Sequence, residues 1–547
     1  MSGPFTVSDY LLVRLKQIGV DHIFGVPGDF VLGFLNQLLQ SDVTYVGTCN
    51  ELNAAYAADG YARIRGVGAV ATTFGVGELS ALNGIAGAYA ERIPVVLIVG
   101  SPATAQFASH ALLHHTLGDY QIPLRIFEKI TTASTQLASA ETAPAEIDRV
   151  LTACLVHQRP VYFSVPSDVA LMACEQPGPF PFPQPEASSP EPLREAVDAV
   201  VAALAKAQRP LIIAGVELIR GKLQDEFAAL LAASGLPFVT MMMGKTVLSE
   251  THPQYCGLFE GDRSIAAVRR RVAEADCVLE LGVWLTDFNT GGFTTHLDDA
   301  RTIQVGHGTV RVRQQNFLNV SLRDCMAGIA RKMAPLAPAA FMPHVRMALE
   351  PPVSEDPLTE QRFFDRVGTF LADNAIVLAE TGVSLFSVAE LHMPEGATFI
   401  GQTFYGAIGY TLGATLGAAM AAPERRVVLF IGDGAFQVAC QELSTLLRQH
   451  LRPIIFLLNN DGYTIERVIC DHPYNDLQPW KYHALVDAFG GGGLALDVRT
   501  EGELETALER AAECETLVLI EVHTGRMDCS PSLQSAGKAM AAINNLT

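Results

Sequence analysis

Apolar residues near the end of the chain follow the pattern of a strand, a helix and a second strand. Residues 426–431 (RVVLFI) and 453–458 (PIIFLL) are continuous apolar runs, typical of buried strands in a parallel sheet. Between them, the apolar positions of residues 435–450 fall mostly on one helical face. Such a unit forms a right-handed crossover between parallel neighbouring strands. The residues that follow the two strands are therefore expected to lie together at the carboxyl edge of one sheet, where α/β proteins bind ligands.

The same alternation of strand and helix patterns recurs through the rest of the chain. Further strands are predicted at residues 69–73, 95–100, 210–214, 277–282, 376–379 and 517–522. These units predict an α/β protein built from three doubly wound domains with parallel sheets.

Two proline-rich stretches, residues 176–192 and 335–357, separate these units and are interpreted as extended linkers. The predicted domains are therefore residues 1–180, 193–340 and 357–547.

The N-terminal residues show the pattern of an amphipathic helix. Ser8 is predicted to cap its start, and Gly19 to end it. The segment has none of the character of a signal peptide.

Composition narrows the class of protein. The 547 residues are 49% hydrophobic and 18% charged, which indicates a folded globular chain. The net charge of −20 argues against nucleic acid or an anionic membrane as partner. Ten scattered cysteines without a CxxC pair favour neither a disulfide framework nor a zinc site. With no apolar run of the ~20 residues that span a bilayer, we expect a cytoplasmic protein. The absence of a GxGxxG loop opening a helix makes a nicotinamide enzyme an unfavourable interpretation.

The residues after the two C-terminal strands have the chemistry of a metal site. Gly432-Asp433-Gly434 follows the first strand, and Asn460 with Gly462 follows the second. Carboxylate, amide and main-chain oxygens are the ligands that Mg²⁺ or Ca²⁺ prefers. The glycines permit close approach of the backbone, and the start of the next helix favours a phosphate. These features predict a metal-bridged diphosphate site, although either motif alone would be an ordinary turn more often than a site.

The segment from GDG to NNDGYTIE resembles the cofactor motif of thiamine diphosphate enzymes. It is most similar to the pyruvate, indolepyruvate and branched-chain 2-oxo acid decarboxylases. The resemblance implies Mg²⁺ held by Asp433, Asn460 and the Gly462 carbonyl. It further implies domains that bind the pyrimidine ring and the diphosphate on either side of a middle domain. The residues implied to contact thiamine diphosphate are Glu51, Thr381, Gly406, Ile408, Asp433, Gly434, Ala435, Asn460, Gly462, Tyr463, Thr464 and Ile465.

Three loops of the first domain carry candidate catalytic groups. Glu51, in NELNAAYA, begins a helix of small residues, so its carboxylate is expected to be buried. Adjacent imidazoles such as His114 and His115, in LLHHTLG, can pass protons near neutral pH. The resemblance implies that Glu51 activates the coenzyme by contacting its aminopyrimidine ring. It groups Asp29, in GVPGDF, with the two histidines and Glu466 as the acid–base set.

The substrate pocket is implied to include Phe288, Leu385, Ile465, Ala536 and Met540. Phe288 and Ile465 resemble the pyruvate decarboxylases, whereas the small Ala536 and the flexible Met540 leave more room than some relatives have. A short aliphatic 2-oxo acid is therefore expected, with pyruvate first and branched-chain acids next. Loss of a methylene from such a pocket changes discrimination by only ~1–3 kcal/mol.

Two other interpretations stay open at this stage. One is a carboligase similar to acetolactate synthase, which shares the cofactor fold but lacks the histidine pair, and carboligation is also possible as a side reaction. The other is a non-catalytic homologue. In the resembling family the pyrimidine and diphosphate domains meet across a subunit interface, which implies a homodimer or homotetramer with shared active sites.

Overall fold

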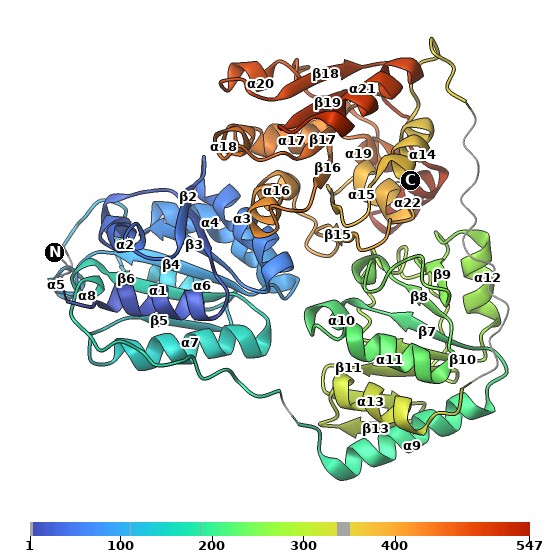
Figure 1. The fold of residues 1–547 in the computed structure, drawn as a ribbon, viewed down its shortest axis with the longest axis horizontal. Helices are drawn as coiled ribbons and strands as arrows, with labels where there is room; N and C mark the ends of the chain where they lie inside the picture. Colours follow the sequence, from blue (N-terminus) through green and yellow to red (C-terminus); the bar gives the residue numbers. More distant parts are fainter. Residues whose placement is uncertain (1–3, 110, 186, 336–350, 547) are drawn as a thin grey trace.

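Three lobes make up the molecule, and each contains one β-sheet covered by helices (Figure 1). The computed structural model describes residues 4–109, 111–185, 187–335 and 351–546. The predicted boundary at residue 340 and most of the proline-rich stretch 335–357 lie outside the described residues. The sequence-predicted strands match observed ones to within one residue at each end.

The first lobe has a six-stranded parallel sheet in the order β2-β1-β3-β4-β6-β5. Its strands are β1 His22–Gly25, β2 Thr44–Gly47, β3 Gly68–Thr73, β4 Val95–Ser101, β5 Ala133–Gln136 and β6 Val161–Pro166. Its helices are α1 Val7–Gln17, η1 Asp29–Val31, α2 Leu32–Leu38, α3 Glu51–Arg65, α4 Val76–Ala90, α5 Thr104–Ser109, α6 Ile122–Phe127, α7 Ala143–His157 and α8 Ser167–Ala170.

The third lobe repeats this topology, with the order β15-β14-β16-β17-β19-β18, again all parallel. Its strands are β14 Ile376–Ala379, β15 Thr398–Ile400, β16 Val427–Gly432, β17 Ile454–Asn459, β18 Leu494–Val498 and β19 Val518–His523. Its helices are α14 Glu360–Phe370, α15 Val383–Glu390, α16 Tyr410–Ala421, α17 Asp433–Ala439, α18 Glu442–Arg448, α19 Thr464–Ile469, η3 Pro473–Asn475, α20 Leu485–Ala488, α21 Glu501–Glu513 and α22 Pro531–Ile543.

The middle lobe has a seven-stranded sheet in the order β13-β12-β11-β10-β7-β8-β9. Its strands are β7 Pro210–Ala214, β8 Phe238–Thr240, β9 Tyr255–Leu258, β10 Cys277–Leu281, β11 Thr302–Gly306, β12 Thr309–Val312 and β13 Gln315–Leu318. Its helices are α9 Pro190–Lys206, α10 Val216–Arg220, α11 Gln224–Ser234, η2 Met242–Gly244, α12 Ala266–Glu274 and α13 Leu322–Lys332.

The three-domain α/β prediction is confirmed, but the middle sheet is not wholly parallel. β12 and β13 run antiparallel at its edge. His307 and Gly308 join β11 to β12 with φ of 49° and 73°. Two consecutive residues with positive φ form the tight turn that favours a hairpin over a crossover.

Three local predictions are wrong. The first helix is capped by Thr6, whose Oγ1 accepts from the Asp9 backbone amide at 3.2 Å, while Ser8 lies inside the helix and donates to a backbone carbonyl. Gly19, with φ of 97°, follows the helix end, as predicted.

The helix predicted over 435–450 is divided between α17 and α18, and the break places Glu442 where it accepts from the Cys49 amide. The linker predicted over residues 176–192 ends at residue 189. Residues 190–192 form the first turn of α9, where proline is tolerated.

Helices α3 and α16 join the first and third lobes by close backbone packing (Figure 1). A Cβ on Gly417 would lie 1.8 Å from the Ala57 carbonyl oxygen, so only glycine fits there. Arg63 of α3 adds to this contact: it pairs with Asp59 at 2.7 Å and Glu91 at 2.8 Å within the first lobe, and it donates to the Gly401 carbonyl of the third lobe at 3.2 Å.

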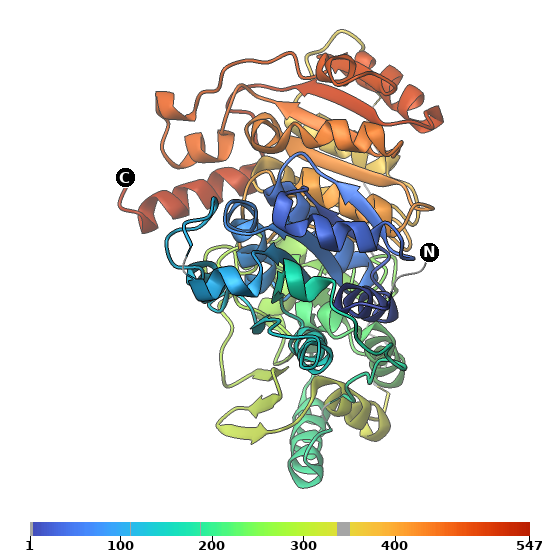
Figure 2. The same cartoon turned by 90° about the vertical axis from the view of Figure 1, so that its left-hand side faces the viewer.

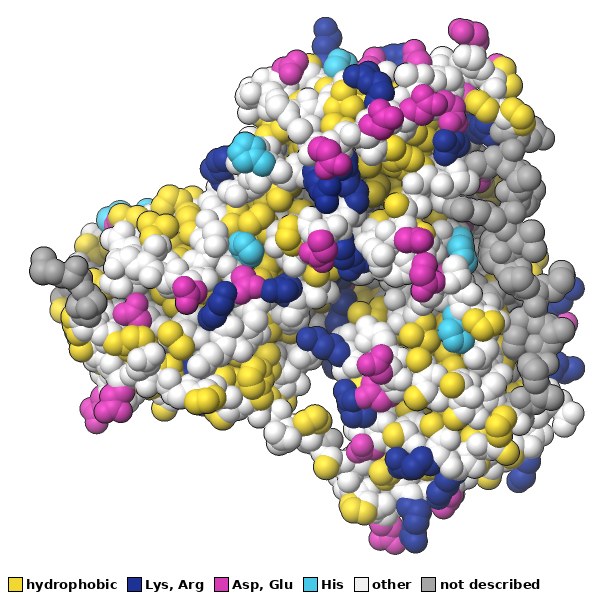
Figure 3. All heavy atoms as spheres, viewed as in Figure 1, with side chains coloured by type: hydrophobic (Ala, Val, Ile, Leu, Met, Phe, Trp, Pro, Cys, Tyr) yellow, Lys and Arg dark blue, Asp and Glu magenta, His cyan; other side chains and the backbone are white. Residues whose placement is uncertain are grey.

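Basic side chains also lie along the junction of the three lobes (Figure 3). A cavity of about 190 Å³ there is lined by Arg63, Arg220 and Arg425, one from each lobe. Seen from the side, α22 projects from the edge of the third lobe (Figure 2). Across the residues that the structure describes, no helix has both the length and the apolar character needed to cross a membrane.

Candidate active site

Asp433 and Asn460 lie side by side, as the crossover predicts. Strands β16 and β17 pair in parallel, with Gly432 opposite Leu458. Asp433 Oδ1 accepts from the Gly434 amide at 2.8 Å, and Oδ2 from the Gly462 amide at 3.0 Å. Burial raises the pKa of the Asp433 carboxyl to about 7, and the two amide donors oppose that rise only in part. A cation at this edge would favour the charged carboxylate.

Several buried oxygens around Asp433 lack a partner within the described part of the chain. Asn460 Oδ1, Thr381 Oγ1 and Ser384 Oγ are buried without a hydrogen bond. Leaving such a group unpaired costs about 1–3 kcal/mol. A metal ion and a diphosphate would satisfy acceptors and hydroxyls of this kind, so the residues present fit the cofactor that the sequence motif implies.

Hydrogen bonds from a buried arginine fix the conformation of the loop after β17. The buried Arg467 side chain donates to the carbonyls of Asn460 and Asp461. Gly462 has φ of 139°, and a Cβ there would lie 2.2 Å from the Asn475 carbonyl oxygen. This conformation is open to glycine and strained for other residues. The geometry explains why NDG, and not a bulkier sequence, follows the strand.

The Tyr463 ring packs closely against Gly434, where a Cβ would lie 2.4 Å from it. Ala435 and Thr464 are buried at the starts of α17 and α19, and Ile465 is half-buried. The predicted contacts Gly406 and Ile408 lie on the loop after β15, where Gly406 has φ of 68° and Ile408 is exposed. Glu466 is exposed on α19.

Glu51 begins α3, as predicted, behind an N-cap in which Asn50 Oδ1 accepts from the Asn53 amide at 2.8 Å. The side chain is half-buried, and this burial raises the pKa of the Glu51 carboxyl. Gly77 of α4 leaves the space beside it free, since a Cβ there would lie 3.1 Å from Glu51 Oε1. Burial thus favours the protonated form of this carboxyl more than solvent would.

Asp29 and the two histidines come together at the carboxyl edge of the first sheet. His114 Nε2 lies 2.7 Å from Asp29 Oδ2, and the rings of His114 and His115 are 4.6 Å apart. The Phe30 ring stacks on His114 at 5.1 Å. His115 has φ of 68°, and its Nδ1 is buried without a partner in the described structure. A proton can therefore be shared between Asp29 and His114, and the His115 ring lies edge-on beside them.

The acid–base cluster of the first lobe is open to solvent in the single chain. The side chains of His114 and Asp29 are 58% and 48% exposed. Leu112 and Leu117, which flank the histidines, are 88% and 56% exposed. Exposed leucines beside an exposed acid–base pair are typical of a surface that another protein surface covers.

A separate apolar cavity of about 60 Å³ lies between the middle and third lobes. It contains four of the five predicted pocket residues, Phe288, Ile465, Ala536 and Met540. Leu385 is completely buried and does not line this cavity, because its side chain lies against Gly401.

Other residues that line the same cavity were missed at the sequence level, among them Arg263, Phe386 and Ile469. Ile469 lies one turn of α19 after Ile465, so helical spacing could have found it, whereas Phe386 directly follows Leu385. No sequence signal marks Arg263, because only the fold brings the middle lobe to this point.

Comparison with known proteins gives matches over all three lobes. Residues 5–121 match the N-terminal TPP-binding domain of thiamine pyrophosphate enzymes, residues 197–329 the central domain, and residues 380–522 the C-terminal TPP-binding domain. The chain is 39% identical to a pyruvate decarboxylase of Aspergillus fumigatus, over 99% of this chain and 98% of that protein. It is 42% identical to an alpha-keto-acid decarboxylase of Mycobacterium avium, over 96% of this chain and 94% of that protein. A protein of the same description from Mycobacterium leprae is 40% identical, over 98% and 95%.

Proposed function

This chain belongs to the thiamine diphosphate-dependent 2-oxo acid decarboxylases, and we propose that its substrate is a short aliphatic 2-oxo acid, pyruvate before branched-chain acids. The observation that carries the substrate proposal is the small apolar cavity walled by Phe288 and Ile465. Its volume of about 60 Å³ suits a side chain of few carbons.

The proposal includes Mg²⁺ held by Asp433, Asn460 and the Gly462 carbonyl. It is supported by the unpaired buried Asn460 Oδ1 and by the carboxylate that both loops orient. These are hard oxygen ligands, and Mg²⁺ completes its shell with phosphate and water. The role of the metal is to anchor the diphosphate.

When bound, thiamine diphosphate supplies the nucleophilic carbon and the electron sink for loss of CO₂. The chain supplies the proton transfers and the apolar surroundings. Glu51, half-buried beside Gly77, would hold the proton exchanged with the aminopyrimidine ring of the bound cofactor. Asp29 and His114, in contact at 2.7 Å, hold protons near the substrate carboxylate together with His115 and Glu466.

Two subunits are proposed to build each site, in a homodimer or a homotetramer. Asp29, Glu51 and the histidines lie in the first lobe, whereas Glu466 and the metal ligands lie in the third. The exposure of His114 and of the flanking leucines supports a partner surface over them. A cytoplasmic location is also proposed, supported by ten cysteines that are all free.

An assay with pyruvate, thiamine diphosphate and Mg²⁺ tests the function. The expected products are acetaldehyde and CO₂ in equal amounts. Acetolactate without aldehyde would instead assign the carboligase interpretation, and no product from any 2-oxo acid would assign a non-catalytic homologue. A panel of kcat/KM values across 2-oxo acids then ranks the substrates.

Replacing Phe288 with Ala should raise activity on branched or aromatic 2-oxo acids relative to pyruvate. The Phe288 ring lines the cavity and packs edge-on against Phe386 at 5.5 Å, so its removal lengthens the pocket. We expect the ratio of kcat/KM values to shift by about 10-fold or more. The same ratio measured with Phe293→Ala, an exposed neighbour outside the cavity, serves as control. An unchanged ratio in Phe288→Ala would contradict the pocket assignment.

A further inference from the structure

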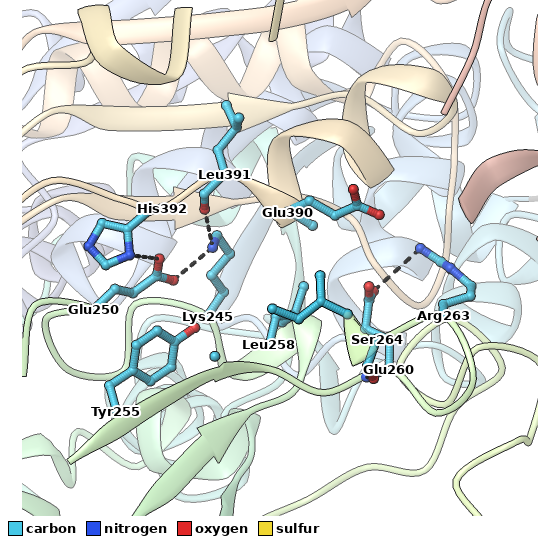
Figure 4. Close-up of a pocket in the computed structure, with 13 residues that line it drawn as sticks. Lys245, Glu250, Tyr255, Leu258, Glu260, Arg263, Ser264, Glu390, Leu391 and His392 are labelled. Atoms are coloured by element: carbon cyan, nitrogen blue, oxygen red, sulfur yellow. Dashed lines mark hydrogen bonds and ion pairs between the residues drawn. The ribbon is translucent and has the colours of Figure 1, made fainter. Parts of the chain in front are cut away.

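Arg263 stands between two cavities. On one side lies the apolar cavity with Phe288, Phe386 and Ile465. On the other lies a cavity of about 40 Å³ between the middle and third lobes, shown in Figure 4. Arg263 lines both of them. Its side chain is only 5% exposed, so it fills the space between them and does not reach into solvent.

Packing and charge hold the Arg263 side chain in that place. Its guanidinium lies over the Phe386 ring, 4.2 Å from the ring centre. One nitrogen is 3.5 Å from Glu260 Oε1, and Nε donates to Ser532 Oγ at 3.4 Å. Arg263 itself comes from the middle lobe, whereas Phe386 and Ser532 come from α15 and α22 of the third. Residues from both lobes, with Arg263 at the centre, therefore separate the two cavities.

The second cavity differs in chemistry from the first. It is lined by Lys245, Glu250, Glu260 and Glu390, with Leu258 and Ile265 as apolar neighbours. Lys245 and Glu250 form a buried ion pair at 2.7 Å, and Lys245 also donates to the Leu391 carbonyl (Figure 4). Glu260 is 1% exposed, and its carboxylate faces the Arg263 guanidinium. Beside these paired groups, Leu258, Ile265 and Ala389 offer apolar surface to a substrate side chain that passes Arg263.

We propose that Arg263 is a specificity-determining residue that sets the longest side chain the substrate pocket accepts. This inference rests on the proposed function, in which the apolar cavity holds the side chain of the 2-oxo acid. The guanidinium closes the far end of that cavity, and Glu260 is a positioning residue that keeps it there. Removing the Arg263 side chain joins the two cavities, so the pocket then takes a straight chain several methylenes longer.

The test is a series of straight-chain 2-oxo acids from pyruvate to 2-oxooctanoate, assayed with wild type, Arg263→Ala and Arg263→Met. With Arg263→Ala, kcat/KM for 2-oxooctanoate relative to pyruvate should rise about 10-fold or more, mainly through a lower KM for the long acid. Arg263→Met, which loses the charge but keeps an unbranched stem that fills part of the space, should give a clearly smaller rise than Arg263→Ala. Ile265→Ala enlarges only the second cavity and should leave the ratio unchanged.

Because Arg263→Ala leaves Glu260 buried without its cation, the double variant Arg263→Ala/Glu260→Gln is measured beside it, with thermal unfolding as a check on folding. Glu260→Gln alone should raise the relative kcat/KM for long acids by a smaller factor, with kcat for pyruvate unchanged. A wild-type chain-length profile in both folded alanine variants would overturn the proposal. So would an Arg263→Met profile equal to that of Arg263→Ala. If Phe288→Ala shifts specificity while Arg263→Ala does not, only the role of Arg263 is overturned. A wild type inactive on every 2-oxo acid would overturn the proposed function, and the role of Arg263 with it.

Discussion

Replacing Asp433 with Asn should remove decarboxylase activity while the chain stays folded. The two side chains have the same shape, and Asp433 is 1% exposed, so the change mainly deletes a charge. Asp433 is the one anionic ligand in the proposed metal set, beside an amide and a carbonyl oxygen. Loss of a residue that only orients metal ligands lowers metal affinity about 10–100-fold. Asp433 is itself a ligand, so we expect its loss to lower the affinity for metal and diphosphate about 100-fold or more.

Thermal unfolding with and without thiamine diphosphate and Mg²⁺ measures this effect. A ligand at about 100 times its Kd stabilises the native state by about 2.7 kcal/mol, and Asp433→Asn should show almost none of that gain at the same concentration. Without cofactor, the free energy of unfolding of the variant should lie within about 1–3 kcal/mol of wild type. The cost arises because the Asn side chain places its NH₂ group, a donor, against one of the two backbone N–H donors that Asp433 accepts from.

Asp461→Asn is the matched control for Asp433→Asn. It deletes the same charge from the exposed neighbour of Asn460, and it should keep both cofactor stabilisation and activity. A full thermal shift in Asp433→Asn would show that the metal lies elsewhere.

The sequence predicts the third-lobe site well because its geometry is local. β16, α17, α18 and β17 follow one another with short connections, so parallel pairing alone places Asp433 beside Asn460. Apolar runs of about four to eight residues mark the buried strands of all three sheets. The catalytic loops of the first lobe, which lie far apart in sequence, were found through resemblance and not through periodicity.

The features that sequence reasoning missed depend on tertiary contacts. The break between α17 and α18 coincides with a hydrogen bond between Glu442 and Cys49 of the first lobe, almost four hundred positions away. The apolar pattern of a helix continues across that break, so periodicity gives no sign of it. Arg263 was missed because the sequence does not show which middle-lobe residues reach the third lobe. Buried arginines need a partner, and here the partner and the stacked ring come from separate segments.

Mixing Glu51→Gln chains with Glu466→Gln chains should restore activity that neither variant has alone. If each site takes Glu51 from one subunit and Glu466 from the other, a mixed dimer has one site with both substitutions and one site with neither. Random pairing of equal amounts makes half of the dimers mixed, so about a quarter of all sites should be intact. Both substitutions keep side-chain shape, so assembly should be unaffected.

The controls follow from the same geometry. When Glu51→Gln chains are mixed with Glu51→Gln/Glu466→Gln chains, every site lacks the Glu51 carboxylate, so the mixture should remain inactive. Differently tagged chains, captured through one tag and detected through the other, establish that subunits have exchanged. If sites were built within one chain, each site in the mixture would carry a substitution, and proven exchange without rescue would contradict shared sites. Rescue would instead explain why Asp29 and His114 face solvent here: a second chain supplies the surface that covers them.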